Sequence, residues 1–193
     1  MTDERTATEA RDLAAADHAM ARYAEGDAAA FGEVFQLLGP RLMRFLRRLT
    51  GSDELSRDLF QETLLRVHQA RGAFRPGSAV LPWAYTIARN VFLDSARARR
   101  RAPPLLPVDD GSSESAVSPQ AESEVAARQT AQRVDRVLAS MSAARREAFV
   151  LLRFEGLSVA DAAEVLGVSE NAVKLRAFQA YELLRAALRS DQK

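Results

Sequence analysis

Cysteine is absent from the 193 residues of this chain. Its absence excludes disulfide bonds, thiolate catalysis and cysteine-ligated metal sites, and it fits a reducing cytoplasm, which is the location we expect. Long apolar runs are also missing. None approaches the roughly 20 residues that a membrane-spanning helix needs, so we expect no membrane insertion. Residues 1–12 are acidic and lack the apolar segment of a secretory signal peptide.

Features that enzymes need are scarce as well. The only histidines are His18 and His68, and neither has a partner at metal-ligand spacing. No glycine-rich phosphate-binding loop occurs. Asp58 and Glu62 lie four residues apart and would share one helix face, but nothing around them indicates a catalytic pocket. We therefore expect no enzymatic activity, no metal and no cofactor.

The first part of the chain is patterned as a helical domain. Apolar residues recur at helical spacing over residues 13–102, which predicts one small all-α domain after a loose leader at residues 1–12. Glycine and proline interrupt the pattern. We expect helix breaks at Gly26 and at Gly39-Pro40, and an exposed loop over residues 74–82.

Basic charge is concentrated in one stretch of this domain, residues 83–101, although the net charge of the whole chain is only +1. Trp83, Ile87 and Val91 recur at four-residue spacing, which predicts a helix with one apolar stripe. The helix ends in a string of arginines. Such a helix can pack on one side and bind a polyanion on the other, but an ordinary amphipathic helix with a solvated basic end explains the residues equally well.

A change of composition separates this domain from the rest. Residues 103–124 are rich in proline and serine, and all their charges are negative, so we expect a flexible acidic linker. Helical spacing resumes over residues 125–193. The predicted fold is all-α, with two small helical domains joined by this linker.

The second domain carries a helix-turn-helix pattern. Ser158 and Asp161 have the spacing of a capping box, Gly167 breaks the following helix, and Ser169 is placed to cap the next one. Ser142 is placed to cap an earlier helix. Structural helical hairpins share this pattern, so it predicts the motif more strongly than it predicts DNA binding.

Three segments in this order, residues 58–67, 83–94 and 157–185, resemble the motifs of one family. The chain resembles the extracytoplasmic-function group of bacterial sigma-70-type sigma factors, over about residues 17–188. The resemblance implies a non-catalytic protein that binds core RNA polymerase and directs promoter-specific transcription initiation. Its partners would be the β′ clamp helices and β flap of the polymerase, and promoter DNA. Many relatives are held inactive by an anti-sigma factor that clamps the two domains.

The resemblance assigns roles to residues of the first domain. The polymerase-binding set would be Asp58, Gln61 and Glu62. The set for the −10 element would be Trp83, Arg89, Asn90, Arg97, Arg99, Arg100 and Arg101, with Arg75 and Ser78 as further candidates in the loop. Within it, Asn90 would border a pocket for a flipped base, while the arginines after it would contact phosphates. Trp83 fits base contact and core packing equally, and Asp94 is expected to hold a nearby arginine.

In the second domain, a recognition helix beginning at Ser169 would enter the major groove of the −35 element. Its contacting set would be Ser169, Glu170, Asn171, Lys174, Arg176 and Phe178. The chain departs from the family pattern here, because relatives often carry Ser at the position of Leu175 and Arg at those of Gln179 and Tyr181. Fewer cations imply fewer phosphate contacts and a shallower salt dependence.

Two questions stay open at this point. The acidic linker would thread toward the RNA exit channel, where it would either imitate an RNA backbone or act as a passive tether. The alternative function is a conventional helix-turn-helix transcriptional regulator that acts without replacing the sigma subunit. That alternative accounts for residues 157–185 but leaves residues 58–67 and 83–101 unexplained.

Overall fold

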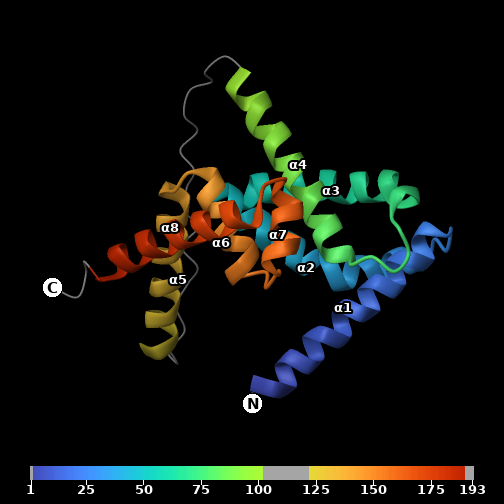
Figure 1. Ribbon diagram of the computed structural model, residues 1–193, viewed down its shortest axis with the longest axis horizontal. Helices are drawn as coiled ribbons and strands as arrows, with labels where there is room; N and C mark the ends of the chain where they lie inside the picture. Colours follow the sequence, from blue (N-terminus) through green and yellow to red (C-terminus); the bar gives the residue numbers. More distant parts are fainter. Residues whose placement is uncertain (1, 102–121, 190–193) are drawn as a thin grey trace.

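The computed structural model describes residues 2–101 and 122–189, and these residues form an all-helical fold (Figure 1). The first half of the chain contains α1 (Thr2–Ala24), α2 (Ala30–Thr50), α3 (Asp53–Ala70), a short 3-10 turn η1 (Arg71–Ala73) and α4 (Val80–Arg101). The second half contains α5 (Glu122–Ser140), α6 (Ala143–Arg153), α7 (Val159–Leu166) and α8 (Glu170–Arg189). The predicted all-α class is confirmed. Among the described helices, none is both long and apolar enough to cross a membrane.

Helix α1 differs from the expected loose leader, because it runs without a break from Thr2 to Ala24. Its second half packs through Ala16, Ala19 and Met20, which are buried. Residues 7–12 are exposed, and the helix there projects from the body of the molecule. Alanine-rich sequence has high helix propensity, so the helix continues beyond the part that packing holds. The expected end of this helix at Gly26 agrees with the structure, where Gly26 has a φ of 109°.

Helix α2 passes through Gly39-Pro40, where we expected a break. A proline inside a helix removes one backbone hydrogen bond and normally kinks or breaks it. Here packing outweighs that cost, because Gly39 is buried and a Cβ at this position would lie 3.4 Å from the ring of Phe60. The helix instead ends at Gly51, whose φ of 71° lets its N–H bond to the carbonyl of Arg47.

Helix α4 begins at Val80, so Pro82 lies within its first turn and the loop shortens to residues 74–79, of which Phe74 is buried and residues 75–79 are exposed. The backbone N–H of Val80 donates to the carboxylate of Asp17, 2.7 Å away on α1, which fixes the start of the helix. The buried face is not the predicted stripe of Trp83, Ile87 and Val91. It is broader, because α4 is covered from more than one side, and it comprises Val80, Leu81, Ala84, Tyr85, Ala88, Val91 and Phe92.

The helix-turn-helix forms as predicted. The hydroxyl of Ser158 accepts the N–H of Asp161 at 3.0 Å, and that of Ser169 accepts the N–H of Ala172 at 3.3 Å. Gly167 ends α7 with a φ of 63°. Ser142 does precede α6, but its side chain makes no capping hydrogen bond, so that expected cap is absent among the described contacts.

The two halves pack against each other. α7 lies against the middle of α4, and α5 and α6 contact α2 (Figure 1). One continuous apolar cluster joins Phe45 and Tyr85 of the first half to Leu151, Leu157 and Leu166 of the second. Most of the expected linker, residues 103–121, lies outside the described residues, and with it the choice between RNA mimic and tether. Its last expected residues, 122–124, belong to α5.

Candidate nucleic-acid interface

The expected polymerase-binding set lies on α3. Asp58 and Gln61 are exposed, so their oxygens face solvent. Glu62 is half-buried and accepts a hydrogen bond from Nε of Arg66 at 2.8 Å. Leu65, one turn after Gln61, is a large apolar side chain that is half exposed, and the sequence reasoning missed it. The face thus combines hydrogen-bond acceptors with one apolar contact.

Arg66 connects this face to α4. Its second nitrogen, Nη1, donates to Asp94 at 2.8 Å, and Asp94 also accepts from Arg97 at 3.1 Å. The hydrogen bond from Arg66 lowers the pKa of the Asp94 carboxyl, and Arg97 adds to that effect. The pKa of Arg66 is raised, first by Asp94 and then by Glu62. Asp94 therefore holds nearby arginines, as expected.

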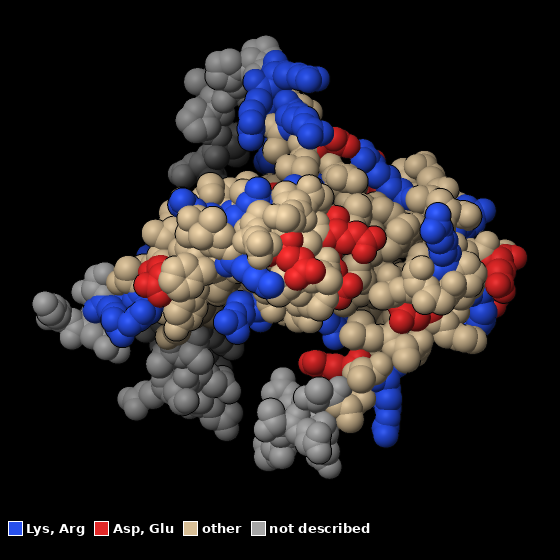
Figure 2. Space-filling model, in the orientation of Figure 1, with Lys and Arg blue, Asp and Glu red and all other residues tan. Residues whose placement is uncertain are grey.

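The free end of α4 is strongly basic. Figure 2 shows Lys and Arg side chains gathered at the tip of this helix, where it projects beyond the rest of the molecule. The exposed side chains there are those of Arg97, Arg99, Arg100 and Arg101. Four cations along one protruding helix end form a surface that phosphates can approach without a clash.

The other end of α4 holds the aromatic part of the expected −10 set. Trp83 is half-buried and packs edge-on against Phe74, with ring centroids 5.3 Å apart. This contact ties the loop to the helix and gives Trp83 a packing role. Asn90 is exposed, so its amide is available to a base edge. Arg75 and Ser78 are exposed in the loop that precedes α4.

Arg89 departs from what its assignment would need, because its side chain is only 19% exposed. Its Nε donates to the carboxylate of Glu147 on α6 at 2.7 Å, and Glu147 is itself 3% exposed. A guanidinium held this way is not presented to solvent. Glu147 lies 58 residues from Arg89 in a mostly apolar helix, and no local pattern marks it.

Tyr85 makes a second polar contact between the halves. Its buried hydroxyl donates to Glu155 at 2.5 Å, and Glu155 also faces Nη1 of Arg48 at 3.6 Å. Burial raises the pKa of the Tyr85 phenol, and the charge of Glu155 raises it further. The phenol is therefore the donor. None of Tyr85, Glu155 and Arg48 was predicted, because their pairing spans 70 or more residues.

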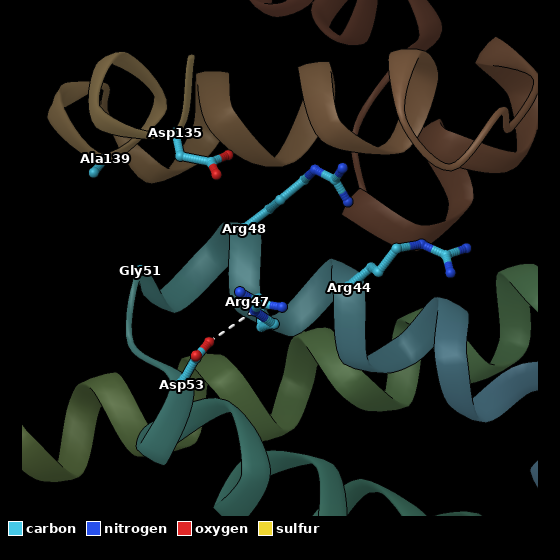
Figure 3. Close-up of a pocket in the computed structure, with 7 residues that line it drawn as sticks. All are labelled: Arg44, Arg47, Arg48, Gly51, Asp53, Asp135 and Ala139. Carbon is cyan, nitrogen blue, oxygen red and sulfur yellow. Dashed lines mark ion pairs between the residues drawn. The ribbon is translucent and has the colours of Figure 1, made fainter. Parts of the chain in front are cut away.

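Arginines also line a hollow between the halves. Figure 3 shows Arg44, Arg47 and Arg48 projecting from the last turns of α2, with Asp135 and Ala139 of α5 on the opposite side. Arg47 is paired with Asp53 at 2.7 Å. The guanidinium of Arg48 lies over the ring of Phe154 at 4.0 Å. Arg48 therefore contacts the second half of the chain, whereas the ion pair of Arg47 lies within the first half.

The expected −35 set lies at the start of α8. Arg176 is half-buried. The other members of the set are exposed: Ser169, Glu170, Asn171, Lys174 and Phe178. Lys174 and Glu170 form an ion pair at 3.6 Å. Leu175 and Phe178 are 57% and 62% exposed, so the helix presents an apolar pair beside its polar residues. Such side chains can contact thymine methyl groups.

One departure from the family pattern has a structural reason. Gln179 accepts a hydrogen bond from Nε of Arg145 on α6 at 3.0 Å, so it helps hold α8 on α6. Tyr181 is half exposed and lines an apolar groove with Val134, Phe149 and Leu184. Both residues therefore make contacts within the second half of the chain.

The two halves match two known families. Residues 34–102 match the model of Sigma-70 region 2, and residues 131–184 match that of Sigma-70, region 4. The region 2 match takes in residues 58–67 and 83–101, which a conventional helix-turn-helix regulator would leave unexplained. The match therefore favours the sigma factor over that alternative.

Whole-chain comparisons agree. RNA polymerase sigma factor CarQ of Myxococcus xanthus is 32% identical over 169 residues, covering 88% of this chain and 95% of that protein. ECF RNA polymerase sigma factor SigM of Mycobacterium tuberculosis is 34% identical over 161 residues, covering 83% and 78%. The sigma factor RpoE of Bartonella quintana, solved in complex with the anti-sigma factor NepR, superposes with a TM-score of 0.66 at 27% identity, covering 83% of this chain and 98% of that chain. The chain therefore belongs to the extracytoplasmic-function group of sigma-70-type RNA polymerase sigma factors.

Proposed function

We propose that this sigma factor works in the cytoplasm, where it binds core RNA polymerase, brings it to a promoter and opens the −10 region, without catalysing a reaction itself. The observation that carries the proposal is the arrangement along one chain of an acceptor-rich face on α3, a protruding basic end on α4 and a capped helix-turn-helix. Each feature suits one step of initiation.

Helix α3 would bind the β′ clamp helices. Asp58 and Gln61 are exposed acceptors, and carboxylates pair well with arginine side chains of a partner helix. Leu65 adds an apolar contact to the same face. Glu62 would take part while still bound by Arg66, which holds its carboxylate in a fixed position.

Helix α4 would serve the −10 element. Arg97 and the three arginines from Arg99 to Arg101 would contact phosphates, which position the protein without reading sequence. Asn90 would hydrogen-bond to a base that has left the duplex. Trp83 would support that site by holding the loop through Phe74.

The second half would serve the −35 element and the β flap. Asn171 and Arg176 can make bidentate base contacts, and Phe178 and Leu175 suit thymine methyl groups. The apolar groove bounded by Val134, Phe149 and Leu184 suits an apolar helix of the flap. An anti-sigma factor is a further partner, because the relative RpoE was solved with one.

The test is transcription in vitro with core polymerase on a library of genomic promoters. Core polymerase plus this protein is expected to start transcripts at specific sites that core alone does not use. A matched control replaces Asp58 and Gln61 with alanine, which should remove those starts while the variant stays folded. If the wild-type protein adds no start sites, or if it binds duplex promoter DNA tightly without polymerase, the proposal is wrong.

A further inference from the structure

We propose that α1 is a positioning helix for promoter recognition: it holds the loop of residues 74–79 at both ends and so fixes how Arg75 and Ser78 meet the −10 element. The inference rests on the proposed role of the first half at that element. The match to Sigma-70 region 2 begins at residue 34, so α1 lies outside it. Helix α1 nevertheless contacts both elements that flank the loop, η1 before it and α4 after it (Figure 1).

One anchor lies where the loop ends. The backbone N–H of Val80, the first residue of α4, donates to Oδ1 of Asp17 at 2.7 Å. The N–H groups of a first helical turn have no partner within the helix, and Pro82 in this turn has no N–H at all. The Asp17 carboxylate also lies at the positive end of the helix dipole, which favours it. Asp17 therefore sets the point at which the loop becomes α4.

The second anchor lies where the loop begins. A hydrogen bond joins the hydroxyl of Tyr23, near the end of α1, to Nδ1 of His68 in the last turn of α3. The guanidinium of Arg71, the first residue of η1, lies 5.8 Å from the centroid of the Tyr23 ring. It also donates to the carbonyl of His68 at 2.7 Å. Tyr23 is 4% exposed, so its ring is fixed in the core and holds the chain just before the loop.

The loop itself contains a defined turn. The N–H of Ser78 donates to the carbonyl of Arg75 at 3.0 Å, and Gly77 has a φ of 85°, a region that favours glycine. Residues 75–79 are exposed, so their side chains can contact DNA. Because both anchors belong to one helix, the two ends of the loop cannot move independently. A loop arranged in this way before DNA binds loses less conformational entropy on binding.

Asp17→Ala tests the anchor at the start of α4. The assay is strand opening by holoenzyme with core polymerase in excess, read by permanganate reactivity of thymines at the −10 element. It uses a promoter that the protein recognises and versions of it with single base changes at −10. We expect opening to slow by about tenfold, because a displacement of about 1 Å in a positioned group can cost even more. The ratio of rates between the original and changed promoters should fall by about threefold, since a displaced side chain loses part of a base contact.

Asp17→Asn is the rescue variant. Its amide oxygen can still accept the N–H of Val80, whereas alanine offers no acceptor. Opening and base preference in Asp17→Asn should therefore be closer to those of wild type than to those of Asp17→Ala. Equal losses in the two variants would contradict a positioning role for the hydrogen bond.

Tyr23→Phe tests the other anchor more mildly. It keeps the ring beside Arg71 and removes only the hydroxyl that bonds to His68. Base preference at −10 should shift in the same direction as in Asp17→Ala, by a smaller factor. If Asp17→Ala does not fold, Tyr23→Phe decides, and an unchanged base preference in it would refute the proposal.

Ser52→Ala is the matched control for a loss of stability. The Ser52 hydroxyl caps α3 by accepting the N–H of Leu55 at 3.3 Å, at the opposite end of α3 from the loop. Losing either this cap or that of Asp17 should lower Tm by about 2–4 °C. Ser52→Ala should nevertheless leave base preference unchanged. The same loss of base preference in Ser52→Ala and Asp17→Ala would show that reduced stability explains the effect, and the proposal would be wrong.

Hydrogen exchange in the free protein measures the anchor without polymerase. A peptide covering residues 74–83 should exchange faster in Asp17→Ala and at the wild-type rate in Ser52→Ala. Unchanged exchange in Asp17→Ala, or faster exchange with unchanged base preference, would overturn the inference even if transcription succeeds. If the wild-type protein starts no specific transcripts, the proposed function fails and this inference with it, whereas the exchange rates still report the anchor.

Discussion

Arg66 of α3 is bound to Asp94 of α4 at 2.8 Å, and the same guanidinium holds Glu62. One arginine therefore joins the helix that carries the expected polymerase contact to the helix that carries the expected promoter contact. Arg97 completes the cluster by bonding to Asp94 at 3.1 Å. A single cluster of ion pairs thus joins α3 to α4.

This cluster makes stability depend on pH in a defined direction. Hydrogen bonding by Arg66 lowers the pKa of Asp94 in the folded protein, so its stabilising contribution exists above the ordinary carboxyl pKa of about 3.9 and is lost as pH falls through the lowered value. Asp94→Asn should therefore lower the urea midpoint near neutral pH, and the difference from wild type should shrink below about pH 4.

Urea unfolding followed by circular dichroism, in steps from about pH 6 to about pH 3, measures this difference. Asp12→Asn, at an exposed position of α1, is the control and should give no pH-dependent difference. The same destabilisation by Asp94→Asn at every pH would show that the ionised pair contributes nothing.

Asp58→Ala should weaken binding to core polymerase by about tenfold, since one charge-assisted hydrogen bond is worth roughly 1.5–3 kcal/mol. Asp58 is exposed, so folding should be unchanged. A titration of core polymerase with dye-labelled sigma factor measures the change. Asp12→Ala removes the same carboxylate from α1 and should bind like wild type; equal loss in both variants would point to net charge instead of a specific contact.

Local chemistry made parts of this fold predictable. The caps at Ser158 and Ser169 and the break at Gly167 depend on atoms within a few residues, and all three formed as expected. The family resemblance placed both halves in order. The prediction that Asp94 holds a nearby arginine is also confirmed. Its negative charge directly precedes the arginines at the end of α4 in the sequence.

Other features depended on contacts that a local pattern does not contain. Pro40 should interrupt a helix by its own chemistry, but packing of Gly39 on Phe60 keeps α2 continuous. The apolar stripe predicted for α4 would bury one face of the helix, whereas α7 packs on a second face. Tyr85 and Glu155 meet across 70 residues of sequence, and nothing near either residue indicates the other.

Ser158→Ala tests the capping of the helix-turn-helix. The Ser158 hydroxyl accepts the N–H of Asp161 at 3.0 Å and donates to its carboxylate at 2.6 Å. Loss of such a cap costs about 1 kcal/mol, which for a chain of this size lowers Tm by about 2–4 °C. Thermal unfolding measures the shift.

Ser140→Ala is the matched control, because its hydroxyl is exposed and donates to the Val137 carbonyl within its own helix. Its effect should stay within about 0.5 kcal/mol. If the two alanine variants unfold at the same temperature, the hydroxyl of Ser158 does not stabilise α7.

Asn90 and Asn171 offer a comparison of the two DNA contacts, because both are exposed asparagines, one on α4 and one on α8. Asn90→Ala should slow strand opening by about tenfold or more, since its amide would hold a base that has left the stack, while binding to closed duplex stays unchanged. Asn171→Ala should do the reverse: it removes a base contact worth about 1–3 kcal/mol and weakens duplex binding at the −35 element. Permanganate reactivity of thymines at the −10 element measures opening, and protection of the −35 duplex measures binding, each with the variant in holoenzyme. Equal effects of both variants on both measurements would mean that the two helices do not divide the work in this way.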